Sequence, residues 1–138
     1  MTAAIFTAGA SDREEVVKLW QAAGLTRPWN DPVADYDRAL ETPASAILLA
    51  KDDGAVFGSV MTGYDGHRGW VYYLAVDPAH RGQGIGRLLM DAAEAWLREQ
   101  GCPKIQLMVR AGNDAAKDFY AALGYEEQPV CTIGKRLD

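Results

Sequence analysis

The chain has 138 residues, of which 49% are hydrophobic, and a formal net charge of −5. This length fits one domain, which can bury roughly two-thirds of its unfolded surface without disulfide or metal support. The acidic balance argues against a nucleic-acid-binding protein, which would carry a basic face, and no apolar run reaches the length of a membrane span. We therefore expect a single domain over residues 1–138, with neither nucleic acid nor a membrane as its partner.

The two cysteines do not form a metal-binding pattern. Cys102 and Cys131 are separated by a spacing that fits no known zinc motif, and residues 1–10 lack the pattern of a signal peptide. Thiols of a cytoplasmic protein are normally reduced. The sequence thus predicts a cytoplasmic protein with two free thiols and no metal.

The first third of the chain predicts one strand and two helices. Residues 3–7 form a short edge strand. Ser11, followed three residues later by Glu14, has the capping-box pattern that begins a helix, and Gly24 is suited to end it. After a loop that contains prolines, residues 32–40 predict a second helix, because proline is favoured at the first helical position.

The middle of the chain predicts a meander of strands. Residues 46–50 and 56–61 are apolar runs separated by an Asp-Asp-Gly turn, which is typical of a hairpin. Residues 63–69 form a second turn, and 70–76 the third strand. A helix with one apolar face follows and ends at Gly101; its apolar positions are Ile85, Leu88, Leu89, Ala92, Ala93 and Trp96.

The last third predicts a strand, a helix and closing strands. Residues 104–110 form the strand, residues 114–123 the helix, and Gly124 ends this helix. Residues 125–137 supply one or two further strands. A meander followed by a strand–helix–strand unit indicates a mixed α/β sheet with helices on both faces.

The run Arg81-Gly82-Gln83-Gly84-Ile85-Gly86 joins a predicted strand to a predicted helix. The start of a helix carries unpaired N–H groups and a partial positive charge, which together bind phosphate. Glycine leaves the backbone accessible to the ligand, and Arg81 adds a positive charge. The run therefore predicts a phosphate-binding loop, although a purely structural strand-to-helix turn would read the same way.

Two familiar phosphate loops do not fit this run. It lacks the Gly-Lys-Ser/Thr ending of a P-loop, which argues against a nucleotide triphosphatase. It also lies past the middle of the chain and has no matching acidic residue after it, unlike the loop of a dinucleotide-binding fold.

Two signatures in the same order resemble those of the GNAT N-acetyltransferase superfamily. The first is Arg81-x-x-Gly84-x-Gly86, preceded by Leu74-Ala75-Val76-Asp77-Pro78. The second is Asn113 followed by a helical run that ends Phe119-Tyr120-Ala121-Ala122-Leu123-Gly124-Tyr125. Further runs at 27–32, 63–69, 101–106 and 134–137 resemble small bacterial members of that family, so the likeness extends over nearly the whole chain.

The resemblance implies a fold and a reaction. The fold would be a mixed, mostly antiparallel sheet of about seven strands, splayed at its centre, with about four helices on both faces. The reaction would transfer an acetyl group from acetyl-CoA, as co-substrate, to a primary amine by direct attack in a ternary complex. The acceptor would be a small molecule or a peptide, and the closing strands offer an edge for pairing in a homodimer.

The resemblance also assigns roles to residues. Tyr120 corresponds to the general acid that protonates the departing thiolate, and its phenol is protonated at neutral pH. The backbone of a strand edge and the glycine loop would bind the cofactor, together with residues of the later helix. The resulting cofactor-binding set is Leu74, Ala75, Val76, Arg81, Gly82, Gln83, Gly84, Ile85, Gly86, Asn113, Ala116, Phe119 and Tyr120.

The general base is not evident. Many relatives have a glutamate where this chain has Trp70 and Met108. Tyr72, which strand alternation places on the same face as Trp70 and Leu74, is our candidate for a second catalytic residue. Asp65, His67 and transfer of the proton to bulk water are alternatives.

The acceptor site is assigned to two loops. Trp29, Tyr64 and Arg68 are the predicted substrate-binding residues, with Arg27 as a second candidate for pairing with a carboxylate. Packing of large aromatic side chains and solvated charges would explain the same residues. Two other functions stay open on the sequence: an acyl-CoA-binding regulatory module without turnover, and a phosphate-ligand protein of another class.

Overall fold

The computed structural model describes residues 3–138, which divide into two compact units, Met1–Leu107 and Met108–Asp138. The single domain expected over residues 1–138 stays a prediction. The first unit holds strands β1 (Ala4–Thr7), β2 (Ser45–Asp52), β3 (Ala55–Tyr64), β4 (Gly69–Val76) and β5 (Ile105–Gln106), and helices α1 (Arg13–Ala22), α2 (Pro32–Glu41) and α3 (Ile85–Glu99). Short 3-10 turns, η1 (Ala10–Asp12) and η2 (Pro78–His80), precede α1 and follow β4.

The described strands form one sheet in the order β1-β2-β3-β4-β5. The first four make an antiparallel meander, and β5 runs parallel to β4. The β2–β3 turn has positive φ at both Asp53 (51°) and Gly54 (80°), which is the type I′ geometry that matches the twist of a hairpin. The predicted meander and the mixed α/β fold are confirmed.

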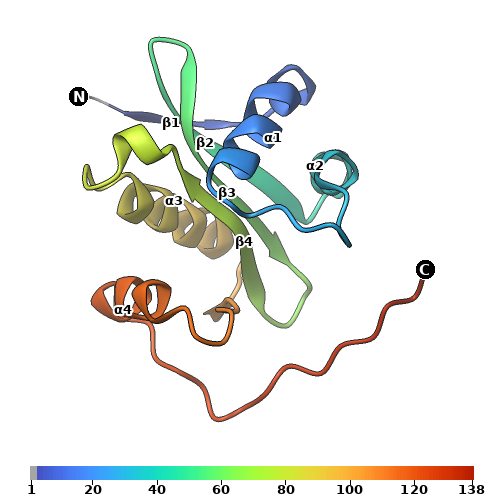
Figure 1. Cartoon of the computed structure of the whole chain (residues 1–138). Coiled ribbons are helices and arrows are strands. Elements are labelled where there is room, and N and C mark those ends of the chain that lie inside the picture. Colours follow the sequence, from blue (N-terminus) through green and yellow to red (C-terminus); the bar gives the residue numbers. More distant parts are fainter. Residues whose placement is uncertain (1–2) are drawn as a thin grey trace. The chain divides into compact units, whose positions relative to one another are not determined.

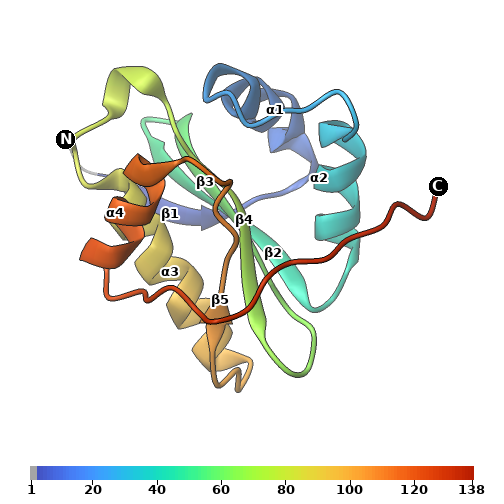
Figure 2. The ribbon, with the colours of Figure 1, turned by 60° about the horizontal axis from the view of Figure 1, so that its bottom comes forward.

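Helices cover both faces of this sheet: α1 and α2 lie on one face and α3 on the other (Figures 1 and 2). The core beneath α1 and α2 is built from apolar side chains of the helices and strands, including Val16, Trp20, Tyr36, Ile47, Leu49 and Ala75. On the opposite face α3 buries Leu89, Met90 and Ala93 completely. The predicted amphipathic helix is therefore confirmed, and it sits directly on the strands.

Close packing between α3 and β3 depends on Gly58. A Cβ atom at this position would lie 2.8 Å from Leu89 Cδ1 and 2.9 Å from Ile85 Cγ2. Because Ile85 is the first residue of α3 and is buried, this contact fixes where the helix begins relative to the sheet. The glycine-rich loop that precedes Ile85 is thereby fixed as well.

Three helices end in the same way, at the glycines predicted to end them. In α1, α3 and α4 (Asp114–Ala122) the glycine after the helix has positive φ and the two 6→1 and 5→2 bonds of a Schellman motif. In α4 these bonds run from Tyr125 N to Tyr120 O and from Gly124 N to Ala121 O, both 3.0 Å. The Leu123-Gly124-Tyr125 run therefore ends the helix as its sequence predicts.

Strand β4 contains a bulge that the sequence did not predict. Met61 pairs with Tyr72 and Ser59 with Ala75, so Tyr73 and Leu74 together oppose Val60. Tyr73 has a φ of 53°, which is rare for a residue with a side chain.

The bulge overturns the predicted alternation along β4. Gly69 faces Leu97 of α3, and strict alternation would put residues 73 and 75 on that same face. Instead Tyr73 and Ala75 pack into the core beneath α1 and α2. Leu74 therefore points to the α3 face, and the predicted common face of Trp70, Tyr72 and Leu74 is wrong, because the extra residue changes the parity of the strand.

The start of α1 also differs from the prediction. Ser11 is not the N-cap: it lies within η1, and Asp12 precedes the first residue of α1. The Asp12 carboxylate instead reaches back to accept a hydrogen bond from Gly9 N (2.9 Å) and pairs with Lys51 Nζ at 3.0 Å. This carboxylate bond belongs to the start of η1, where Asp12 is the third residue after Gly9, and Asp12 makes no side-chain capping bond to α1. The extra 3-10 turn thus gives Asp12 the part that the sequence predicted for Glu14.

The second unit holds α4 and an extended C-terminal segment. The strand predicted over 104–110 is reduced to Ile105–Gln106, and the strands predicted within 125–137 are absent from the described residues, so the sheet has fewer than the expected seven strands. Val130, Ile133 and Leu137 are more than three-quarters exposed. Their spacing of three and four residues gives no apolar face with the period of two that a half-buried strand requires. No helix among the described residues is long and apolar enough to cross a membrane.

We predict that Gly58→Ala destabilises the protein by about 1–3 kcal/mol, because the new methyl group overpacks the contact with Leu89 and Ile85. Gly9→Ala is the matched control, since the nearest atom to its Cβ would be 4.0 Å away. Denaturant unfolding measures both variants. Equal stability of the two would show that α3 can move away from β3 at no cost.

We predict that Asp12→Asn lowers the free energy of unfolding by about 1 kcal/mol at pH 7. The Gly9 N–H, followed by Lys51, holds the pKa of the Asp12 carboxyl below its usual range. A carboxyl with a lowered folded pKa stabilises the protein above its unfolded pKa, and this contribution is lost as the pH falls through the folded pKa. The difference from wild type should therefore vanish in acid. The exposed turn variant Asp53→Asn is the control for loss of a carboxylate, and a constant difference between Asp12→Asn and wild type across the pH range would contradict the assignment.

Candidate functional site

The outer edge of β4 is open along most of its length. Strand β5 pairs only with Gly69 and Trp70, so from Val71 to Val76 this edge has no strand partner among the described residues. Leu74 and Val76 are half-buried, and Ala75 is buried in the core at 2% exposure. An extended ligand with amide groups can pair with such an edge as an added strand does.

The open edge leads directly into the glycine-rich loop. Asp77 follows β4 and caps η2 by accepting a hydrogen bond from Ala79 N at 3.0 Å. The loop begins at the exposed Arg81 and ends at Gly84, the N-cap of α3. The strand edge and the helix start are thus separated by one short turn.

The loop has the properties of a phosphate cradle. Gly82 and Gly84 have φ values of 79° and 77°, and a Cβ at either position would meet no atom within 4 Å, so the space beside the backbone is open. The first N–H groups of α3, at Ile85 and Gly86, have no acceptor within the helix. Gln83 is exposed beside them. Open glycine backbone, unpaired donors and the positive end of a fifteen-residue helix fit a pyrophosphate.

His80 helps to fix this loop and was missed by the sequence analysis. Its ring stacks on Phe57 of β3, with ring centres 4.8 Å apart and an interplanar angle of 17°. Its buried Nδ1 lies 3.9 Å from Asp77 Oδ2, too far for a hydrogen bond. A histidine in a turn gives no sequence signal for such stacking.

The candidate residues for proton transfer lie around the β3–β4 turn. Asp65 accepts hydrogen bonds from the N–H groups of Arg68 and His67, both at 2.8 Å, and from Trp70 Nε1 at 3.2 Å. These bonds, that of Arg68 first, lower the pKa of the Asp65 carboxyl, which makes it a weak base. Tyr72 is 46% exposed, and the partial burial of its phenol, followed by the charge of Asp65, raises its pKa.

The predicted acceptor residues lie in the α1–α2 loop and around the β3–β4 turn of the first unit, where Tyr64 is the last residue of β3. Trp29 is 53% exposed in the α1–α2 loop. Tyr64 and Arg68 make local hydrogen bonds at the β3–β4 turn: Tyr64 Oη donates to the Gly66 carbonyl and Arg68 Nη1 to the His67 carbonyl. Arg27 donates to the carbonyls of Gly24 and Thr26, so its guanidinium fastens its own loop.

A buried network around Tyr73 connects β4 to both helices on its face. The ring of Tyr73 stacks on Trp20 of α1 (3.9 Å, 11°), and its hydroxyl donates to Asp35 Oδ2 of α2 at 2.7 Å. Ser59 Oγ accepts from Trp20 Nε1 at 2.9 Å and lies 3.1 Å from the Tyr73 carbonyl, to which it donates. Burial, then the bond to Asp35, raises the pKa of Tyr73.

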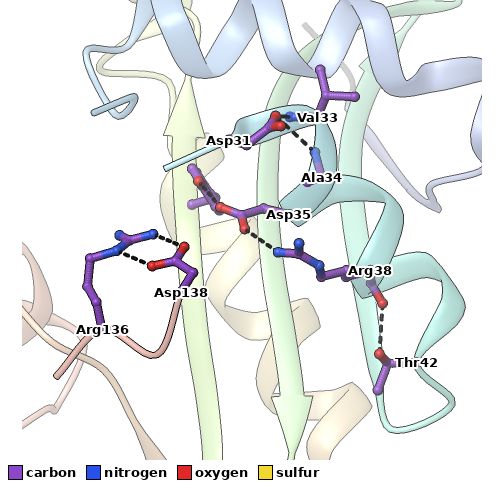
Figure 3. A network of polar contacts seen from close by, with 9 residues as sticks. Asp31, Val33, Ala34, Asp35, Arg38, Thr42, Arg136 and Asp138 are labelled. Atoms are coloured by element: carbon purple, nitrogen blue, oxygen red, sulfur yellow. Dashed lines mark hydrogen bonds and ion pairs between the residues drawn. The ribbon is translucent and has the colours of Figure 1, made fainter. Parts of the chain in front are cut away.

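Helix α2 presents Asp35 to this network (Figure 3). Asp31 caps the helix by accepting from the N–H groups of Val33 and Ala34, and Asp35, one turn later, lies 3.8 Å from Arg38 Nη1. No residue pattern predicts this network, because the bulge that turns Tyr73 toward Asp35 has no signal in the sequence.

The second unit carries the other predicted cofactor residues on α4. Asn113 is the N-cap of this helix and accepts from Ala116 N at 3.1 Å. The Tyr120 ring makes edge contacts with Phe119 (5.0 Å) and Tyr125 (5.8 Å), and burial raises its pKa. Further along, Arg136 pairs with Asp138, as Figure 3 also shows.

The predicted residues therefore form two groups. In the first unit the structure brings together the strand edge at Leu74, Ala75 and Val76 and the loop from Arg81 to Gly86. In the second unit it brings together Asn113, Ala116, Phe119 and Tyr120 on α4. The roles assigned to both groups stay predictions.

Solved structures of two N-acetyltransferases have a fold similar to that of this chain. The aminoglycoside N-acetyltransferase AAC(6')-Iy, solved with a bisubstrate analogue, has a TM-score of 0.84 at 21% identity over 99% of both chains. A ribosomal-protein-alanine N-acetyltransferase of Brucella melitensis has a TM-score of 0.79 at 21% identity over 99% of this chain and 100% of its own. At these identities the likeness concerns the fold.

Sequence comparison adds the family. The chain is 49% identical over 127 residues to acetyltransferase YE1169 of Yersinia enterocolitica, which covers 92% of this chain and 90% of that protein. The finer likeness that we noted in the sequence, to the small bacterial acetyltransferase YpeA, stays a prediction. Residues 14–125 match the model of the acetyltransferase (GNAT) family, and the chain belongs to this family of acetyltransferases.

Proposed function

We propose that the protein transfers an acetyl group from acetyl-CoA to a primary amine by direct attack in a ternary complex. The observation that carries this proposal is the continuity between the open edge of β4 and the glycine-rich loop. One surface binds amides and the next binds phosphates, in the order in which coenzyme A presents them. A structural relative has been solved with CoA, which supports the same ligand here.

The backbone of Leu74 and Val76 would hold the pantetheine arm, and the loop from Arg81 to Gly86 the pyrophosphate. By resemblance, Asn113, Ala116 and Phe119 contribute from α4. Bound acetyl-CoA supplies an activated thioester. An N–H of the strand edge that donates to the acetyl oxygen would stabilise the negative charge that develops there.

Tyr120 is the proposed general acid. A departing thiolate needs a proton, and a phenol whose pKa is raised by burial stays protonated at and well above neutral pH. Such a group donates a proton and does not act as a base. Tyr120 can therefore serve this role over the whole physiological pH range.

The amine loses its proton without a dedicated carboxylate in this proposal. Asp65 is a poor base, because its pKa is lowered by hydrogen bonds. Tyr72 has a raised pKa, and its protonated hydroxyl is suited to orient the amine or a water molecule rather than to accept a proton. The proton would pass through water to solvent.

The acceptor is a small molecule or a peptide that carries a primary amine. Trp29, Tyr64 and Arg68 are its proposed contacts; Trp29 is exposed, whereas Tyr64, at the end of β3, and Arg68 are half-buried. The structural relatives include an aminoglycoside acetyltransferase and one named for a ribosomal-protein alanine, which supports testing both classes.

We predict that Gly84→Ala weakens acetyl-CoA binding at least tenfold, about 1.4 kcal/mol, because a methyl group would enter the space of the pyrophosphate. Gly54→Ala is a matched control: its φ of 80° is close to the 77° of Gly84, and its Cβ also points into open space. Both variants thus carry a similar backbone strain, and isothermal calorimetry compares their affinities.

Wild-type protein that is folded but does not bind acetyl-CoA would refute the proposed function. Equal weakening in both glycine variants would show that strain, and not the loop, causes the effect.

We predict that Tyr120→Phe lowers kcat about a hundredfold with little change in KM, because only proton donation is lost. Thiol release with an amine identified from a panel of small amines and N-terminal peptides measures this. Tyr125→Phe, a neighbouring ring on the same helix end, is the control. An unchanged kcat in Tyr120→Phe would remove Tyr120 from the mechanism.

A further inference from the structure

We propose that Tyr73 and Asp35 are positioning residues that hold the β4 bulge in the conformation in which the Leu74 backbone faces the cofactor arm. This inference rests on the proposed function, since it explains which side chains hold the edge of β4 in the conformation that would bind the pantetheine arm. Neither residue is proposed to touch the cofactor or the acceptor.

The bulge needs an external constraint. Tyr73 has a φ of 53°, in the left-handed region that is unfavourable for a residue with a Cβ. Strained backbone persists where surrounding contacts over-determine it. Without such contacts the residue would return to the extended conformation, and the peptide groups on either side would rotate.

Three different parts of Tyr73 are held. Its ring is stacked on Trp20, its carbonyl accepts from Ser59 Oγ, and its hydroxyl donates to Asp35. Trp20 and Ser59 are completely buried and bound to each other, so they form a fixed support on the core side. The bond to Asp35 is the one contact of the three that comes from α2.

Asp35 is well placed for this task. Its side chain is 32% exposed and lies one turn after Asp31, which fixes the start of α2 through its cap. A hydrogen bond to a charged acceptor is stronger than one between neutral groups and more directional than stacking. The bond therefore sets the rotation of the Tyr73 side chain and, through it, the backbone that leads to Leu74.

The glycine-rich loop is held by other contacts. Asp77 caps η2, His80 stacks on Phe57, and Ile85 packs over Gly58. None of these involves Tyr73 or Asp35. Loss of the Tyr73–Asp35 bond should therefore disturb the binding of the pantetheine arm and leave the phosphate site intact.

The test compares Tyr73→Phe with Tyr36→Phe. Tyr36 lies in the same core and its ring is near that of Trp20, but its hydroxyl donates to the Gly9 carbonyl at 2.5 Å, outside β4 and α2. Acetyl-CoA binding is measured by calorimetry. Binding of ADP, which carries the pyrophosphate without the arm, is followed by NMR shift titration on the same samples.

We expect Tyr73→Phe to lose about three- to tenfold in acetyl-CoA affinity, with unchanged ADP affinity, while Tyr36→Phe keeps both. Asp35→Ala should reproduce the loss, and Asp35→Asn, which keeps a side-chain acceptor, should recover most of it. Because Asp35 is partly exposed, its variants give the same comparison if Tyr73→Phe does not fold.

Equal acetyl-CoA affinity in Tyr73→Phe and Tyr36→Phe would overturn the inference, and so would a parallel fall in ADP affinity. Either result leaves the proposed function standing, provided that wild type binds acetyl-CoA. Failure of wild type to bind acetyl-CoA would instead refute the proposed function and this inference with it.

Discussion

The extra residue in β4 is the constraint on which the rest of the site depends. It puts Tyr73 and Leu74 opposite a single residue of β3. From this point on, the β4 side chains that would have faced α3 face the core beneath α1 and α2, and the others face α3. As a result Tyr73 and Ala75 pack in the core beneath α1 and α2, a position that a regular strand would have given to Leu74. The opposite edge of β4, where β5 pairs only with Gly69 and Trp70, has no strand partner at Leu74 among the described residues. The conformational cost at Tyr73 is met by aromatic stacking and by hydrogen bonds from two other elements.

A second constraint, the contact of α3 with β3 at Gly58, fixes the other half of the site. Since Ile85 begins the helix and packs over Gly58, the unpaired N–H groups of the first turn have a defined position relative to the strand edge. The two halves are anchored by different residues, one set on each face of the sheet. Backbone groups for amides and backbone groups for phosphates are thus held independently, with side chains acting mainly as their supports.

The parts of the structure that local chemistry dictates could be predicted from the sequence. Glycines at 24, 101 and 124 end three helices as expected, because a positive φ is required there, and the apolar spacing in residues 85–96 located α3. The bulge could not be predicted, since neither Tyr73 nor Leu74 has an unusual composition signal and the alternation rule assumes a regular ladder. The Tyr73–Asp35 bond joins residues 38 positions apart, and it arises only once the parity of β4 has changed. The prediction of C-terminal strands was wrong for a different reason. It relied on β-forming residue types, but without a period of two these residues do not bury one face of a strand.

This division between backbone and side-chain groups also explains why the sequence indicates the cofactor but not the acceptor. A ligand recognised by strand edges and glycine backbone leaves a recognisable pattern in the chain, namely glycines with positive φ and open space beside the backbone, followed by a helix start. An acceptor is recognised by side chains on loops, here around Trp29 and Tyr64, where many residues satisfy the same fold. Family membership therefore follows from the cofactor half. The acceptor must be inferred from the chemistry of the loops, in which Arg27 Nη1 already donates to the carbonyls of Gly24 and Thr26, so that part of its hydrogen-bonding capacity serves the loop and not an anionic acceptor.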